Sequence, residues 1–186
     1  MPKRTIDLIV GDFYHIYNRA VTNNKLFIEE RNYWFFISKI KKYLLNTTDI
    51  LAYCLMPNHY HLVVKLRDIN LPTSMQRLAM SYTGAFNKVY GRSGHLFQGR
   101  YQMRLIHSLK HLVQVVNYIH LNPCSAGLTR SPEERKLSSY LEYIGERNVD
   151  FIKPEIVLEV YGSGNDMCFH EDKLNYRKVI EKLVLD

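Results

Sequence analysis

The chain has 186 residues, 46% of them hydrophobic, and its 25 Lys and Arg against 18 Asp and Glu give a formal net charge of +7. This length and apolar content predict one folded domain with a substantial core and exclude a disordered chain. The positive charge favours an anionic partner. No apolar run approaches the roughly 20 residues that span a bilayer, and the first residues lack a signal-peptide pattern, so we expect a cytoplasmic protein without a membrane segment.

Hydrophobic periodicity predicts alternating strands and helices along the chain. Strand, helix, strand, strand, helix, strand is the order of the split β-α-β arrangement, so we expect an α+β, ferredoxin-like core with a four-stranded antiparallel sheet. We expect a main domain over 1–146, and a helical C-terminal tail over 147–186 packed on or beside it. The predicted elements are a strand at 13–21, a helix at 29–45, a hairpin of strands at 50–56 and 59–66, a helix from Pro72 towards Gly91, a strand at 101–107, and helices at 109–121 (ending before Pro123), 133–146, 153–160 and 171–185.

Two histidines occupy alternate positions of the predicted strand 59–66. Side chains alternate across a strand, so His59 and His61 share one face with Lys65, and the apolar residues between them form a core face. The two imidazoles are about 7 Å apart along the strand. They could converge on one metal ion.

A second candidate motif ends the helix predicted at 109–121. Tyr118 and Asn122 are four residues apart, so they share a helix face one turn from each other. A metal held by two histidines would polarise a phosphoryl oxygen, and the tyrosine oxygen would attack phosphorus and become covalently attached. Two His and one amide oxygen are softer than the ligands Mg²⁺ or Mn²⁺ usually prefer, so zinc competes on ligand hardness.

His59-Tyr60-His61 resembles the HUH motif (His, hydrophobic, His) of single-tyrosine DNA transposases. Four segments extend the likeness: FYHIYNRAV, MPNHYHLVV, GHLFQGRY, and YIHLNP followed by Ala-Gly-Leu. Together, over about 12–145, they resemble the REP-associated tyrosine transposases of bacteria, relatives of insertion-sequence transposases.

The resemblance implies an HUH nuclease domain over 1–146 that acts in the cytoplasm, at the nucleoid. It implies a divalent metal, Mg²⁺ or Mn²⁺, and cleavage of single-stranded or hairpin DNA of repetitive extragenic palindromes. The intermediate would be a 5′-phosphotyrosine with a free 3′-OH, which allows rejoining without ATP. By position, His59, His61 and Asn122 would be metal ligands and Tyr118 the nucleophile. Many insertion-sequence relatives have glutamine where Asn122 stands.

The resemblance also bears on oligomeric state and on DNA contacts. Insertion-sequence relatives act as dimers with the tyrosine supplied in trans, whereas the REP-associated branch tends to be monomeric, so we expect a monomer. Basic groups with an interleaved aromatic suit phosphates and a stacked, unpaired base, although Phe97 could instead be a core residue. The candidate DNA-binding residues are Lys3, Arg4, Lys65, Arg92, Phe97, Arg100 and Arg104.

Two other functions stay open from the sequence. One is a nucleic-acid-binding regulator that kept the fold and is catalytically silent. The other is a metal-dependent phosphodiesterase that activates water and forms no covalent tyrosine. His120 lies on a different helix face from Tyr118, so it is either structural or close to DNA. Five further histidines have no pairing in the sequence that forces a role: His15, His95, His107, His111 and His170.

Overall fold

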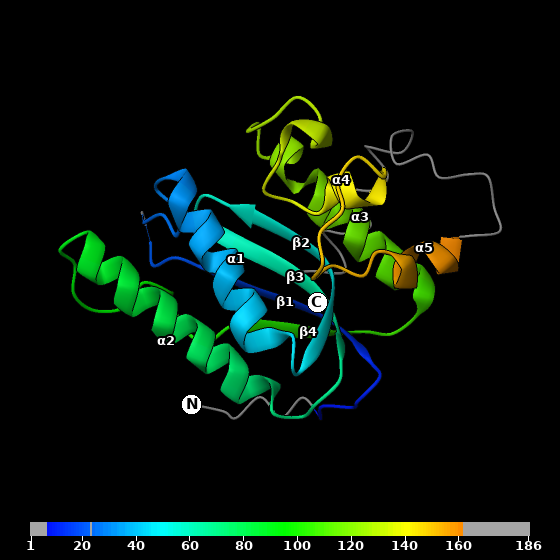
Figure 1. Cartoon of the computed structure of the whole chain (residues 1–186), viewed down its shortest axis with the longest axis horizontal. Coiled ribbons are helices and arrows are strands. Elements are labelled where there is room, and N and C mark those ends of the chain that lie inside the picture. Colours follow the sequence, from blue (N-terminus) through cyan, green and yellow to red (C-terminus); the bar gives the residue numbers. More distant parts are fainter. Residues whose placement is uncertain (1–6, 23, 162–186) are drawn as a thin grey trace.

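The computed structural model describes residues 7–22 and 24–161. A four-stranded antiparallel sheet in the order β2-β3-β1-β4 runs through its centre (Figure 1). The chain order of strands and helices is that of the predicted split β-α-β arrangement, which confirms the ferredoxin-like α+β fold. The strands are β1 (Phe13–Arg19), β2 (Thr48–Met56), β3 (His59–Leu66) and β4 (Gln102–Ile106).

Helices cover both faces of the sheet. In Figure 1, α1 and α2 lie on one face and α3 lies on the other. No helix in the described part of the chain is both long and apolar enough to cross a membrane. The helical elements are α1 (Glu30–Leu44), α2 (Leu71–Val89), α3 (Leu109–Ser125), the short 3-10 helix η1 (Pro132–Glu134), α4 (Tyr140–Tyr143) and α5 (Glu155–Tyr161).

Alternate residues of β3 divide between two cores. Tyr60, Leu62 and Val64 are buried in the larger cluster, which the side chains of α1 and α2 complete. Val63 belongs to the second cluster, with apolar residues of α3 and β2. The predicted core face of this strand is therefore confirmed, and its histidine face is directed towards α3.

Helix α3 continues past residue 121, where the sequence predicts its end. Pro123 lies in the last turn of the helix, where it costs the backbone hydrogen bond to the Ile119 carbonyl, but only two helical residues follow it. The helix ends at Ser125, and Gly127 just beyond it has φ +68° and donates its N–H to the Cys124 carbonyl at 3.0 Å. The predicted end before Pro123 was wrong, and Asn122 is thus held in regular helix.

The predicted helix at 133–146 is also wrong. Only η1 and the single turn of α4 are helical there, and the chain between them runs along the outer edge of β2. Leu55 N–H donates to the Leu137 carbonyl at 3.0 Å, and Ser139 N–H donates to the Tyr53 carbonyl at 2.9 Å. Backbone groups at a sheet edge need partners, and this requirement outweighs the helical pattern of the segment.

The tail predicted over 147–186 is described only in part. Helix α5 spans Glu155–Tyr161, close to the predicted 153–160, and its Val157 is buried in the cluster that α3 forms with the sheet. The described part of the tail thus packs against the main domain. The helix predicted at 171–185 lies outside the described residues.

Candidate active site

The two histidines predicted as metal ligands lie on the face of β3 that α3 covers. In the register between β1 and β3, His59 is opposite Arg19 and His61 is opposite Tyr17. Directly opposed residues of an antiparallel pair point to the same side of the sheet, so Tyr17 and Arg19 share this face. The rings of His59 and His61 are 5.0 Å apart between centroids. The strand therefore brings the two imidazoles together as the sequence predicts.

The contacts of His59 make its Nε2 atom an acceptor. Its Nδ1 lies 2.7 Å from Oδ1 of Asn58, and an amide oxygen only accepts, so Nδ1 donates. Burial lowers the pKa of His59, so the ring is neutral at pH 7 and Nε2 carries a lone pair. This Nε2 faces Oδ1 of Asn122 at 3.3 Å. Two acceptor atoms thus face each other, an arrangement that a cation between them would satisfy.

One ring nitrogen of His61 has a hydrogen-bond partner and the other has none. Its Nδ1 lies 3.0 Å from Nε2 of His15. Its own Nε2 is buried and has no hydrogen-bond partner. Burial, reinforced by His15 and His59, holds the pKa of His61 well below 6.5. A buried polar atom without a partner calls for an explanation, and a metal ligand is one role that supplies the missing partner.

Helix α3 presents Tyr118 and Asn122 to these histidines. The two residues are one helix turn apart, and their side chains hydrogen-bond to each other. The ring of Tyr118 meets that of His61 edge-on, 5.8 Å between centroids. Burial raises the pKa of Tyr118 above 10, so its hydroxyl is protonated at neutral pH. The structure therefore brings the predicted nucleophile and the three predicted ligands together within one chain.

Three atoms form the candidate metal centre: Nε2 of His59, Nε2 of His61 and Oδ1 of Asn122. Two ligands at right angles, each about 2.1 Å from an ion, lie about 3 Å apart, close to the 3.3 Å between His59 Nε2 and Asn122 Oδ1. Within the described residues, no group of three His, Cys, Asp or Glu side chains could hold a metal, so a third protein ligand at this site would have to be another kind of group, such as the Asn122 amide. Imidazole suits zinc and amide oxygen suits Mg²⁺ or Mn²⁺. The donor set fits a divalent cation without selecting one.

Of the arginines predicted to bind DNA, Arg104 lies on this face. Arg104 is half-buried on β4 and lies directly opposite His15 in the register with β1, so both point to the α3 side. Arg100 is exposed just before β4 begins. The position of Arg104 suits a contact to a DNA phosphate beside the candidate site.

Two other predicted DNA contacts lie farther away. Lys65 shares the histidine face, but four residues separate it from His61, about 13 Å along the strand. Its ammonium lies over the ring of Phe13, 5.8 Å from the centroid. Arg92 lies over the ring of Phe86, a core residue of α2, at 5.7 Å. Arg92 therefore belongs to the opposite side of the sheet from the histidines.

The aromatic residue of this set is buried. Phe97 is 8% exposed and belongs to the core cluster on the α1 and α2 side, with its ring 6.2 Å from that of Tyr60. This placement matches the core alternative, because a buried ring offers no face on which a base could stack. Lys3 and Arg4 lie outside the described residues.

Sequence reasoning gave no role to three residues that the structure places at the site. Arg19 is exposed beside His59, and its Nε donates to Oε1 of Gln98. Tyr17 is a second tyrosine here, with its ring 6.0 Å from that of His61. His15 contacts His61 directly. All three lie on one face because side chains alternate along β1. Since β1 lies beside β3 in ferredoxin-like sheets, this alternation could have predicted that the three residues lie near the histidines.

His120 has a structural role. It is fully buried, and its Nε2 lies 2.8 Å from Oγ of Ser139. Ser139 in turn accepts the Tyr53 N–H of β2 at 2.9 Å. The imidazole therefore ties α3 to the segment on the edge of β2, and of the two roles left open by the sequence the structural one holds.

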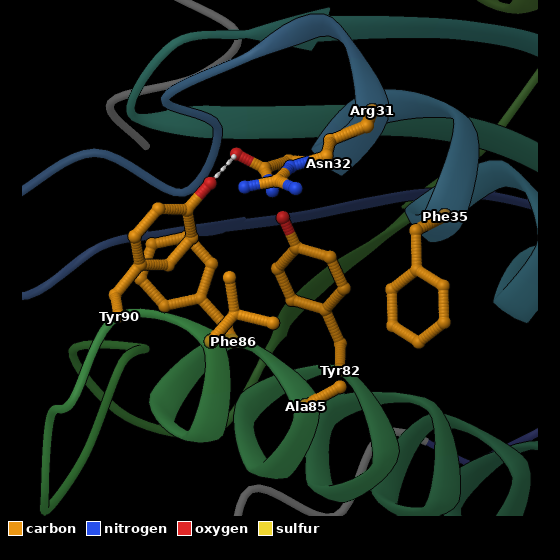
Figure 2. A pocket seen from close by; sticks show the side chains of 8 residues that line it. Arg31, Asn32, Phe35, Tyr82, Ala85, Phe86 and Tyr90 are labelled. Carbon is orange, nitrogen blue, oxygen red and sulfur yellow. Dashed lines mark hydrogen bonds between the residues drawn. The ribbon is translucent and has the colours of Figure 1, made fainter.

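A cavity of about 250 Å³ lies elsewhere, between α1 and α2 (Figure 2). Figure 2 shows Tyr82, Phe86 and Tyr90 of the α2 side directed towards α1. The Tyr90 hydroxyl donates to Oδ1 of Asn32 at 3.1 Å. Because α1 and α2 cover the face of the sheet opposite α3, this cavity is separate from the candidate active site.

The fold matches that of a solved transposase structure. The chain is similar to a REP-associated tyrosine transposase whose structure was solved bound to a REP hairpin, with a TM-score of 0.68 and 17% sequence identity over 82% of this chain and 94% of that one. At this identity the likeness shows the fold. A search of curated proteins found no significant match.

The sequence itself matches the family described as "Transposase IS200 like" over residues 13–122, more than half of the chain. The chain therefore belongs to the IS200-like transposase family. The matched region begins with β1 and ends at Asn122, so it contains every residue of the candidate site.

Proposed function

We propose that this chain cleaves and rejoins single-stranded DNA beside a hairpin, with Tyr118 as the nucleophile. The observation that carries the proposal is the position of Tyr118, one helix turn from Asn122 and 5.8 Å from His61. Membership of a transposase family supports DNA as the substrate. The REP hairpin bound to the related transposase supports hairpins of repetitive extragenic palindromes as the DNA recognised.

The proposed step exchanges one phosphate ester for another. Oη of Tyr118 attacks phosphorus, its proton leaves to water, and the bond from phosphorus to the 3′ oxygen of the preceding nucleotide breaks. That oxygen takes up a proton and leaves as a free 3′-OH, while the 5′ phosphate stays on Tyr118. Attack by a 3′-OH on the phosphotyrosine reverses the step, so rejoining needs no ATP.

We propose that the cofactor is Mg²⁺ or Mn²⁺, held by His59, His61 and Asn122. When bound, such a cation polarises the phosphate and offsets negative charge in the transition state. Burial keeps both imidazoles neutral and ready to act as ligands. Arg19, exposed beside His59, adds a positive charge at the position where a phosphate would approach.

Each rival function conflicts with part of this arrangement. A catalytically silent regulator would have no need of a buried and a half-buried imidazole, an amide and a tyrosine gathered in one place. A water-using phosphodiesterase would need the metal site but not Tyr118. We also propose that the active form is a monomer, because one chain supplies all four residues.

The test uses labelled hairpin DNA that carries a single-stranded extension. Wild type and Tyr118→Phe are incubated with it in Mn²⁺ and run on a denaturing gel. Tyr17→Phe is the matched control, because Tyr17 also lies beside His61. We expect a covalent adduct with wild type and Tyr17→Phe and neither adduct nor cleavage with Tyr118→Phe. Mass spectrometry should map the DNA-linked peptide to Tyr118.

The same gel separates the alternatives. Cleavage by Tyr118→Phe without any adduct would establish the water-using phosphodiesterase. Intact DNA with all three proteins, together with specific hairpin binding, would establish the silent regulator. An adduct that maps to Tyr17 would move the nucleophile to β1.

A further inference from the structure

A pair of buried imidazoles joins β1 to β3 behind the candidate metal centre. His15 is 4% exposed and His61 is 7% exposed. Nε2 of His15 lies 3.0 Å from Nδ1 of His61, the ring centroids are 5.2 Å apart, and the ring planes are inclined by 21° to each other. In the antiparallel register His15 is opposite Val63, which makes it a diagonal neighbour of His61 on the same face.

A hydrogen bond between two neutral imidazoles has a single N–H, which comes from one ring or the other. If His15 donates, the proton of His61 sits on Nε2, a buried atom for which the structure offers no acceptor. If His61 donates through Nδ1, Nε2 keeps a lone pair. Only the second arrangement avoids a buried N–H without a partner.

We propose that His15 is a positioning residue that accepts the Nδ1 proton of His61 and so fixes the tautomer in which His61 Nε2 can bind a divalent cation. The proposal rests on the metal centre proposed above. Ligand histidines usually give their second N–H to a carboxylate, a backbone carbonyl or water; here a second imidazole takes that place.

His59, the other proposed histidine ligand, also donates a hydrogen bond through its Nδ1, but to a different kind of acceptor. Nδ1 of His59 donates to Oδ1 of Asn58 at 2.7 Å, as Nδ1 of His61 donates to His15. Both Nε2 atoms are thereby left unprotonated, and that of His59 faces Oδ1 of Asn122. The partner of His59 is exposed on the β-hairpin turn, whereas the partner of His61 is buried in the sheet. The geometry therefore makes His15 the more rigid of the two supports.

Removing the acceptor has a predictable consequence. Neutral histidine in water favours the proton on Nε2, so His61 without His15 reverts to the tautomer that cannot bind metal through Nε2. Loss of such a supporting partner typically weakens metal binding about 10- to 100-fold. The variant His15→Leu removes the acceptor, whereas His15→Gln places a side-chain oxygen near the position of Nε2.

The first experiment reads the tautomer in the metal-free protein. Long-range ¹H–¹⁵N NMR of ¹⁵N-histidine-labelled protein distinguishes the two tautomers, and a His61→Asn sample assigns the His61 signals. We expect the proton on Nδ1 of His61 in wild type and in His15→Gln. A proton on Nε2 of His61 in wild type overturns the proposal, and this readout needs no His15 variant to fold.

The second experiment measures Mn²⁺ affinity from the EPR signal of the free ion. We expect His15→Leu to bind Mn²⁺ about 10- to 100-fold more weakly than wild type, and His15→Gln to recover most of that loss. His111→Leu is the matched control, because His111 lies close to His15 but is neither a proposed ligand nor the proposed acceptor of the His61 proton. Its affinity should equal that of wild type.

The outcomes separate the two proposals. If wild type binds no Mn²⁺, the metal centre itself is refuted. If wild type binds Mn²⁺ and a folded His15→Leu binds it equally well, only the role of His15 is refuted. Equal losses in His15→Leu and His15→Gln, with unchanged circular dichroism, would also count against an acceptor role.

Discussion

Tyr118 and His61 lie 5.8 Å apart, ring centroid to ring centroid, on α3 and β3 of the same chain. The predicted nucleophile and ligands therefore need no second subunit to meet. We expect that a mixture of Tyr118→Phe and His61→Ala proteins forms no covalent adduct with hairpin DNA. A denaturing gel with the same labelled hairpin DNA measures whether the adduct forms. Adduct formation by the mixture would mean that one chain lends its tyrosine to another, and light scattering would then show a dimer.

Asn122 permits a graded test of the metal centre. Asn122→Ala removes the third ligand but keeps the Tyr118 hydroxyl, so we expect some adduct at a raised Mn²⁺ requirement. The increase should be at least about tenfold, since losing a ligand costs more than losing a supporting partner. Asn122→Gln retains an amide oxygen on a longer side chain and should need less Mn²⁺ than Asn122→Ala. An unchanged Mn²⁺ requirement in Asn122→Ala would remove Asn122 from the ligand set.

Arg104 should contact DNA phosphate, because it lies opposite His15 on the face that carries the candidate site. Each phosphate contact to single-stranded DNA contributes a slope of about −0.7 in log affinity against log salt. We expect Arg104→Ala to make the slope shallower by about this amount. Arg77→Ala removes the same charge from the exposed surface of α2 and serves as the control. Equal slopes for the two variants would contradict the contact.

His120 predicts how stability depends on pH. Burial lowers its pKa to about 3 in the folded protein, against about 6.5 when unfolded. Between these values the unfolded chain binds a proton that the folded chain does not, so stability rises with pH and is lost as pH falls below about 6.5. The loss should reach about 1.4 kcal/mol per pH unit.

Urea unfolding at pH 7, 5 and 4 measures this effect in wild type and in His120→Gln. Glutamine does not titrate and can still hydrogen-bond to Ser139. We expect the variant to lose stability less steeply between pH 6 and pH 4, by about 1.4 kcal/mol per pH unit. If the free energy of unfolding falls equally with pH in the two proteins, His120 is not held neutral in the folded state.

The sequence predicted the fold wherever the pattern is local and regular. The β3 strand, with its histidine face and its core face, follows from the period of two, and α1 and α2 follow from helical spacing. The segment containing Leu137 and Ser139 was mispredicted because its partner is the edge of β2, roughly 80 residues earlier. No local periodicity reports such a contact.

The site was predictable to the extent that its residues share an element. His59 with His61, and Tyr118 with Asn122, are pairs whose spacing puts them on one face. His15, Tyr17 and Arg19 were missed because their role depends on which strand lies beside β1. Phe97 shows the opposite case: its surroundings in sequence suit a DNA-binding loop, whereas tertiary packing buries its ring.

The segment along β2 also protects the molecule from self-association. β2 is an outer strand of nine residues, buried along most of its length, and an uncovered apolar edge of this kind can recruit strands from other molecules. Leu137 and Ser139 occupy its backbone groups near one end, and Ile152 pairs with Ile50 near the other. Truncating the chain before Leu137 should therefore yield a protein that aggregates through its sheet, even though every residue of the candidate site is retained.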